Sequence, residues 1–165
     1  MKYFAYGSNV CTNRLRDRVP SCRFYAVATL DCYTLKFHKR STDGSGKCNA
    51  TFTNDQDDHI IGVVFEIDEA DKSDLDDAEG FGSGYNERIV DVLTANGIIS
   101  AYMYVADPTA IDNSLAPYTW YMDFVVGGAR QHELPEEYIK GLETIKAVVD
   151  PDKLRADRNR RLLPC

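Results

Sequence analysis

The chain has 165 residues, of which 44% are hydrophobic and 27% are charged, and its formal net charge is −7. This length and composition predict one soluble domain with a core of its own. An acidic chain argues against binding to nucleic acid or to anionic membranes, because both need clustered lysines and arginines. No segment is long and apolar enough to span a bilayer. The one dense basic stretch, 155–161, is interrupted by Asp157, and we interpret 150–165 as a charged C-terminal tail.

The cysteines and histidines give no sign of a metal centre or a disulfide framework. The five cysteines are odd in number and include no C-x-x-C pair, so we expect reduced thiols and no zinc-thiolate site. The three histidines are scattered along the chain. The first residues carry one lysine and no sustained apolar run, which is unlike a signal peptide, so we expect a cytoplasmic protein.

The first half of the chain predicts strands with two helices among them. Alternating aromatic and small residues favour a strand over 2–6, and the Gly7-Ser8-Asn9 break precedes a short helix over 12–18. Runs rich in Val, Thr, Tyr and Phe predict strands over 23–30, 32–38, 50–53 and 60–67. The apolar run at 62–65 suggests that the last of these is buried on both faces. An acidic helix over 69–78, capped by Asp68, then ends in a glycine-rich stretch.

The second half predicts a hairpin and then longer helices. Segments 85–93 and 98–105 form the hairpin across Ala95-Asn96-Gly97. Apolar spacing predicts helices over 117–127 and 134–149. Strands followed by helices indicate an α+β fold with a small mixed β-barrel in a single domain, 1–165. The glycines at 80, 82 and 84 have the wrong spacing for a dinucleotide site and precede a strand.

Three features of the sequence could carry chemistry. The Tyr6-Gly7-Ser8-Asn9 segment joins a strand end to a helix start and could bind an anion, although from spacing alone an ordinary capped turn is the commoner structure. Glu79 falls at the end of the acidic helix, where the carbonyl dipoles disfavour negative charge, as suits a proton-transfer group. A solvated helix face is the simpler interpretation of that acidic run. The third feature is a set of aromatic residues whose tyrosines could line a polar pocket or pack in the core: Tyr6, Tyr85, Tyr102, Tyr118, Tyr121 and Trp120.

Taken together, these features resemble the γ-glutamylcyclotransferase family. The motifs that carry the resemblance are, in chain order, Tyr3-Phe4-Ala5-Tyr6-Gly7-Ser8-Asn9, Leu75-Asp76-x-x-Glu79-Gly80-x-x-Ser83-Gly84-Tyr85, Ala101-Tyr102-Met103, Pro117-x-x-x-Tyr121-x-x-x-Val125-x-Gly127-Gly128-Ala129 and Leu134-Pro135-x-x-Tyr138. They extend over about 2–149, nearly the whole chain. The start motif alone would be weak, but the full set in order is specific.

The resemblance implies an enzyme that releases 5-oxoproline from a γ-glutamyl amide without cofactor or metal. It implies that Glu79 is the catalytic general base and acid, and that Gly7, Ser8 and Asn9 form the substrate-binding loop. It also implies a pocket lined by tyrosines: Tyr6, Tyr85, Tyr102 and Tyr121. The expected partner is a small γ-glutamyl compound, which could be a γ-glutamyl amino acid, a γ-glutamyl amine, glutathione or a protected biosynthetic intermediate. A homodimer is consistent with the resemblance.

Two alternatives remain open from the sequence. A non-catalytic binding or regulatory protein on the same fold would keep the pocket without the chemistry, but such a protein could lose Glu79 freely. An amide-hydrolysing or acyl-transfer enzyme with a cysteine nucleophile would be inactivated by thiol alkylation, and substrate would protect it.

Overall fold

A computed structural model describes all 165 residues, and its centre is a closed barrel of five strands in the order β1-β5-β2-β6-β7. The barrel strands are β1 (Lys2–Ala5), β2 (Arg23–Asp31), β5 (His59–Glu66), β6 (Tyr85–Thr94) and β7 (Gly97–Ala106). Four of the pairings are antiparallel, and β1 closes the barrel against β7 in parallel, at Tyr3 and Tyr102. A separate hairpin joins β3 (Tyr33–Arg40) and β4 (Gly46–Phe52). The predicted α+β fold with a mixed barrel is confirmed.

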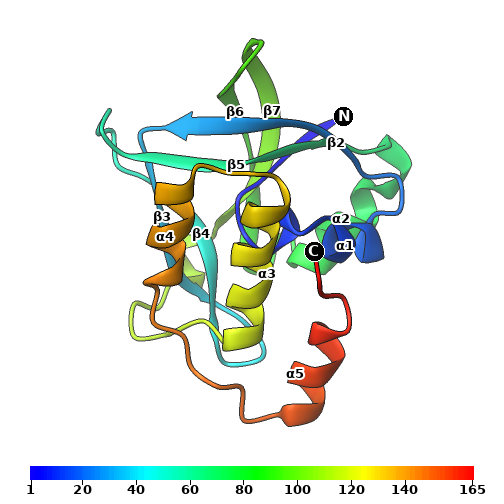
Figure 1. Ribbon diagram of the computed structural model, residues 1–165, viewed down its shortest axis with the longest axis vertical. Helices are drawn as coiled ribbons and strands as arrows, with labels where there is room; N and C mark the ends of the chain where they lie inside the picture. The colour runs from blue at the N-terminus through cyan, green and yellow to red at the C-terminus, as the bar shows by residue number, and fades with distance from the viewer.

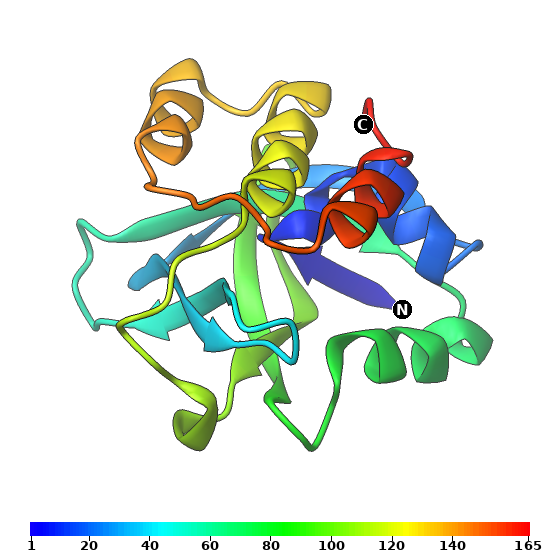
Figure 2. The same ribbon diagram turned by 90° about the horizontal axis from the view of Figure 1, so that it is seen from below.

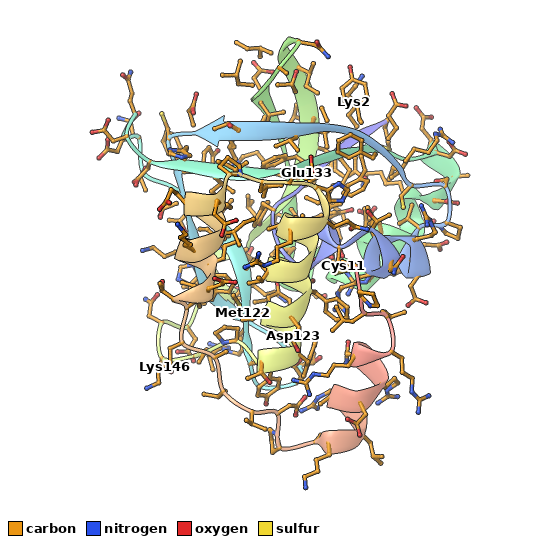
Figure 3. The ribbon with its side chains drawn as sticks, viewed as in Figure 1. Lys2, Cys11, Met122, Asp123, Glu133 and Lys146 are labelled. Atoms are coloured by element: carbon orange, nitrogen blue, oxygen red, sulfur yellow. A yellow bond between two sulfur atoms is a disulfide. The ribbon has the colours of Figure 1, made fainter.

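The helices lie around the barrel, with α2 and α4 on opposite sides of the molecule (Figures 1 and 2). They are α1 (Thr12–Arg18), α2 (Lys72–Glu79), α3 (Thr119–Gln131), α4 (Glu136–Glu143) and α5 (Lys153–Arg160), with single 3₁₀ turns η1 (Ser8–Val10), η2 (Glu69–Asp71) and η3 (Pro108–Ala110). The side chains of the barrel and of α3 fill the space between them (Figure 3). No helix is long and apolar enough to cross a membrane.

Close packing between α3 and the loop after β1 fixes the position of that loop. A Cβ atom on Gly128 would lie 2.4 Å from the backbone nitrogen of Cys11 and 2.6 Å from the carbonyl carbon of Val10. Only glycine therefore allows α3 to approach this backbone so closely. Phe4, Phe65 and Phe124 are fully buried in the core, and the run at 62–65 is buried on both faces as predicted.

The structure corrects several predicted element boundaries, among them the end of α3, which lies at Gln131 and not at 127, and those of β4 and α4. Strand β4 begins at Gly46, four residues before the predicted start at 50, because Gly46 and Lys47 pair with Arg40 and Lys39 of β3. Helix α4 ends at Glu143, although the apolar pattern continues to 149. The chain beyond it becomes extended, because Val148 accepts a hydrogen bond from the Thr119 amide and donates one to the Pro117 carbonyl, both at 2.9 Å.

The region predicted as a charged tail contains α5, which is packed against α3. The fully buried Asp150 carboxylate accepts hydrogen bonds from Trp120 Nε1 at 2.7 Å and from Arg155 Nε at 2.8 Å. Arg160 adds an ion pair of 3.0 Å with Asp123 of α3. The basic residues of this segment therefore attach it to the domain. Sequence spacing could not reveal this, because Trp120 and Asp150 are 30 positions apart and Asp123 and Arg160 are 37 apart.

This attachment predicts a pH-dependent stability. The Arg155 guanidinium, together with Trp120, holds the pKa of Asp150 well below its usual range. A depressed carboxyl pKa contributes stability above the unfolded pKa of about 4, and that contribution is lost as the pH falls below it. We expect Asp150→Asn to lower the free energy of unfolding by about 1.5–3 kcal/mol at pH 7. Urea titrations from pH 7 to pH 3 should show the difference from the parent shrinking; a constant difference would contradict the assignment.

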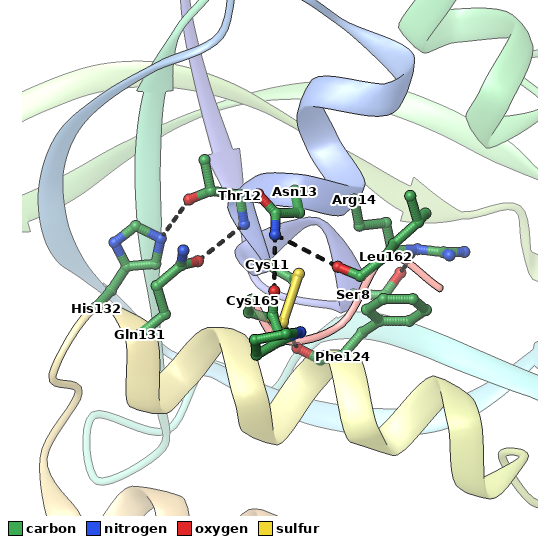
Figure 4. Close-up of a disulfide and its surroundings, with 11 residues drawn as sticks. Ser8, Cys11, Thr12, Asn13, Arg14, Phe124, Gln131, His132, Leu162 and Cys165 are labelled. Carbon is green, nitrogen blue, oxygen red and sulfur yellow. Dashed lines mark hydrogen bonds between the residues drawn. A yellow bond between two sulfur atoms is a disulfide. The ribbon is translucent and has the colours of Figure 1, made fainter. Parts of the chain in front are cut away.

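The structure also corrects the expectation that all cysteines are reduced, because Cys11 and Cys165 form a disulfide (Figure 4). Their Cα atoms are 5.0 Å apart although 154 positions separate them in sequence. Asn13 Nδ2 donates a hydrogen bond of 2.7 Å to the Pro164 carbonyl and holds the same segment. The prediction was wrong because it used the odd number of cysteines and the absence of a C-x-x-C pair. A single disulfide between distant residues depends only on whether the fold brings those two cysteines together.

Candidate active site

The glutamate and the loop after β1, which the sequence places 70 positions apart, meet at one end of the barrel. Glu79 is the last residue of α2, and Gly80 follows it in the left-handed conformation (φ 69°, ψ 45°), which ends the helix there. Glu79 Oε1 accepts hydrogen bonds from Asn9 Nδ2 at 2.8 Å and from Arg18 Nη1 at 2.7 Å. Both contacts hold the carboxylate in place through Oε1, and Oε2 is left without a protein partner.

A cavity with about 310 Å³ of empty space, its open mouth included, surrounds this carboxylate. Its lining contains all but one of the predicted site residues: Tyr6, Gly7, Ser8, Asn9, Glu79, Tyr85 and Tyr121, with Tyr3, Cys48 and Tyr104 in addition. The cavity is therefore a built site and not a solvated helix face.

Tyr102 is the predicted site residue that the structure does not bring into this lining. Its ring packs 5.3 Å from the ring of Tyr3, and its buried hydroxyl has no hydrogen-bond partner. Tyr104, two residues further along β7, lines the cavity instead and donates a hydrogen bond of 2.5 Å to Asp76. Residues two apart in a strand share a face, so the alternation of β7 could have pointed to Tyr104 as well.

The tyrosines that shape the cavity are held by hydrogen bonds to the backbone. Tyr6 donates to the Tyr104 carbonyl, and Tyr85 donates to the Cys48 carbonyl at 2.5 Å. Tyr121 accepts from the Cys48 amide at 3.1 Å. Burial raises the pKa of the Tyr6, Tyr85 and Tyr121 hydroxyls, so they stay neutral at physiological pH. They can position a substrate but are poorly suited to act as bases.

Gly7 leaves the cavity open. A Cβ atom at this position would lie 3.0 Å from Cys48 Cβ and 3.2 Å from the Tyr121 hydroxyl, so a side chain would fill the space between the loop and those walls. The glycine is therefore needed for this close approach.

Two arginines of α1 support the site and were missed by the sequence interpretation. Arg18 contacts Glu79 directly, as described above. Arg14 Nε donates to Ser8 Oγ at 3.0 Å, its Nη1 donates to Asn159 Oδ1 at 3.1 Å, and its guanidinium lies 4.5 Å from the Phe124 ring. Burial lowers the pKa of Arg14 to about 10, so it remains charged at neutral pH. Their spacing of four on one predicted helix was the available signal, because it places both on one face.

The cavity thiol is unsuited to be a nucleophile. Burial raises the pKa of Cys48 to about 12, so it stays protonated at neutral pH, whereas the reactive form is the thiolate. We expect Cys48→Ala to keep kcat within about tenfold of the parent, far above the loss that removal of a covalent nucleophile causes. Alkylation with iodoacetamide should likewise spare activity, with Cys32→Ala as the control for a thiol outside the cavity. Substrate-protected inactivation would contradict this prediction.

The fold and the cavity place the protein in a known class, since residues 59–142 match the AIG2-like family. The chain is 36% identical over 150 residues to the γ-glutamylcyclotransferase of Bos taurus, covering 87% of this chain and 78% of the relative, and 33% identical over 149 residues to that of Homo sapiens, with the same coverage. A solved γ-glutamyl cyclotransferase superposes with a TM-score of 0.83 at 27% identity, covering 97% of this chain and 98% of that chain. The chain belongs to the γ-glutamylcyclotransferase family, which confirms the resemblance seen in its motifs.

Proposed function

We propose that the protein is a γ-glutamylcyclotransferase that converts a γ-glutamyl amide into 5-oxoproline and a free amine, with Glu79 as general base and acid. The observation that carries this proposal is the position of Glu79: its carboxylate stands in the cavity, held through Oε1 by Asn9 and Arg18, while Oε2 is free to meet a substrate. The function agrees with the named activity of the relatives.

The reaction needs one proton carrier. Glu79 Oε2 takes a proton from the α-ammonium group of the substrate, and the neutral nitrogen attacks the γ-carbonyl carbon to form the new C–N bond. Glu79 passes this proton to the leaving nitrogen as its bond to that carbon breaks. The ring nitrogen loses a second proton as it becomes an amide, and this proton passes through the same carboxylate to the released amine, which leaves as an ammonium ion. Both nitrogens are bonded to the same carbon once the ring has closed, so one carboxylate beside that carbon can serve both transfers. No covalent intermediate with the protein is required.

The cavity's other contribution is to fold the substrate for ring closure. The attack is intramolecular, so holding the amine over the carbonyl removes much of the entropic barrier. The Gly7-Ser8-Asn9 loop lines the same cavity as Glu79, and the charged Arg14 bonded to Ser8 favours negative charge of the substrate at this loop. The buried tyrosines supply neutral walls.

The test is release of 5-oxoproline from a panel of γ-glutamyl amino acids, γ-glutamyl amines and glutathione by the purified protein. We expect release from at least one class, at a rate well above the protein-free reaction. If no compound gives 5-oxoproline but γ-glutamyl compounds raise the unfolding temperature, the protein is a binding protein on this fold. If no compound gives 5-oxoproline and none raises the unfolding temperature, the γ-glutamyl assignment fails.

A homodimer and a cytoplasmic location are further proposals. Light scattering of the purified protein measures the first. For the second, fractionation combined with thiol labelling is needed, because the cytoplasm keeps most thiols reduced and the Cys11–Cys165 bond would have to be protected there. A role in glutathione metabolism would follow only from turnover of glutathione in the panel.

A further inference from the structure

A second chamber, with about 560 Å³ of empty space, its opening to solvent included, adjoins the cavity of Glu79 and shares four lining residues with it: Ser8, Glu79, Tyr85 and Tyr121. Its charged lining consists of four cations, Arg14, Arg18, Lys39 and Lys47, and two carboxylates, Asp43 and Glu79. The chamber thus has an excess of two positive charges although the whole chain has a net charge of −7. Such a local excess attracts anions.

Two of these cations already have carboxylate partners. Arg18 pairs with Glu79 and Lys47 with Asp43, each at 2.7 Å. Arg14 has only neutral partners, the Ser8 hydroxyl and the Asn159 amide oxygen. Lys39 forms no ion pair, and its Nζ lies 4.5 Å from the centre of the Tyr85 ring. The excess charge is therefore located on Arg14, beside the loop of Ser8, and on Lys39, beside Tyr85.

The position of Lys39 costs stability unless something offsets its charge. Lys39 and Lys47 are directly opposite each other in the β3–β4 hairpin, and like charges at facing positions destabilise a sheet. Lys39 is also half-buried, and this burial lowers the pKa of its ammonium group. A Cβ atom on Gly84 would lie 2.9 Å from both Cε and Nζ of Lys39. The ammonium group can therefore occupy this position only because residue 84 has no side chain. An anion bound in the chamber would offset these costs.

We propose that Lys39 is a specificity-determining residue that binds a carboxylate on the amine half of the substrate, so that γ-glutamyl compounds with an anionic leaving amine are preferred to neutral ones. This inference rests on the proposed function. The γ-glutamyl half carries one carboxylate of its own, for which Arg14 at the Ser8 loop is the unpaired cation. Lys39 is the remaining unpaired cation, and the shared wall of Tyr85 connects it to the reacting cavity.

The test compares two substrates that differ only in this charge, γ-glutamyl-alanine and γ-glutamyl-alaninamide. We expect the parent to prefer γ-glutamyl-alanine in kcat/KM by about tenfold or more, which is the size of one charge-assisted contact. Lys39→Met should lower kcat/KM for γ-glutamyl-alanine to near that of the amide and leave the amide unaffected. Lys39→Arg should keep the preference. Lys36→Met, an exposed lysine of the same strand outside the chamber, is the matched control.

Three outcomes would overturn the assignment: no preference in the parent, an equal loss for both substrates in Lys39→Met, or the same change in Lys36→Met. Binding of the two compounds to Glu79→Gln, with and without Lys39→Met, gives the same comparison by calorimetry without turnover. Parent protein that binds both compounds yet releases no 5-oxoproline would contradict the proposed function alone. Equal binding of the two compounds would contradict the role of Lys39 alone.

Discussion

Glu79→Gln is expected to lower kcat for 5-oxoproline release by about 10²–10⁴-fold, the usual contribution of a positioned acid–base group. Glutamine is isosteric with glutamate, and its amide oxygen can accept the hydrogen bonds that Asn9 and Arg18 donate to Oε1. It cannot take up the proton of the substrate's ammonium group. Substrate binding should therefore survive while turnover is lost.

The measurement is kcat and KM for the best substrate of the panel, with circular dichroism to show that the variant is folded. Asp77→Asn is the matched control, because it removes a carboxylate from the exposed face of the same helix. We expect that control to keep activity close to the parent. A folded Gln variant with kcat within tenfold of the parent would show that Glu79 is not the base, and would direct attention to water or another cavity group.

Loss of the Cys11–Cys165 disulfide is expected to lower the free energy of unfolding by about 2–5 kcal/mol. The bond closes a loop that contains nearly the whole chain, so its removal restores a large amount of freedom to the unfolded state. Without the disulfide, the C-terminal segment is attached at this point only by noncovalent contacts such as the hydrogen bond from Asn13 to the Pro164 carbonyl. Cys165→Ser should show the effect without reductant, and the parent should show it when reductant is added.

Urea unfolding of the parent and of Cys165→Ser, each with and without dithiothreitol, measures this effect. Cys32→Ser is the control, because Cys32 is a free cysteine in the loop between β2 and β3. Reductant should change the parent and the control alike, and should leave Cys165→Ser unchanged. A parent whose unfolding midpoint is insensitive to reductant, with free thiols at both positions, would mean that the bond does not form in solution.

The sequence predicted the elements whose formation depends on local pattern. The helix over 12–18 coincides with α1, and the β6–β7 hairpin follows from a turn signal between alternating strands. The position of Glu79 beside the loop of Gly7, Ser8 and Asn9 came from the family resemblance, because spacing alone favoured a solvated face. The fold and the cavity could thus be predicted from the sequence where local patterns or family motifs specify them.

What the sequence missed depends on contacts between distant residues. The end of α4 is set by pairing of Val148 with Pro117 and Thr119, which overrides a continuing apolar pattern. The docking of α5 depends on Asp150 meeting Trp120, and the disulfide on two ends of the chain meeting beside α3. The exchange of Tyr102 for Tyr104 follows from how the barrel closes, since Tyr102 is the residue of β7 that pairs with β1.

The contact between Arg14 and Asn159 links the site to the order in which the chain is synthesised. Every strand of the barrel, and Glu79 itself, leaves the ribosome before α5 does. The nascent barrel can therefore collapse with Ser8 and Arg14 in place but without the Asn159 oxygen that accepts from Arg14 Nη1. We expect ribosome-bound chains that stop before α5 to be compact yet less active than the released protein, so that activity develops as a late event of biosynthesis.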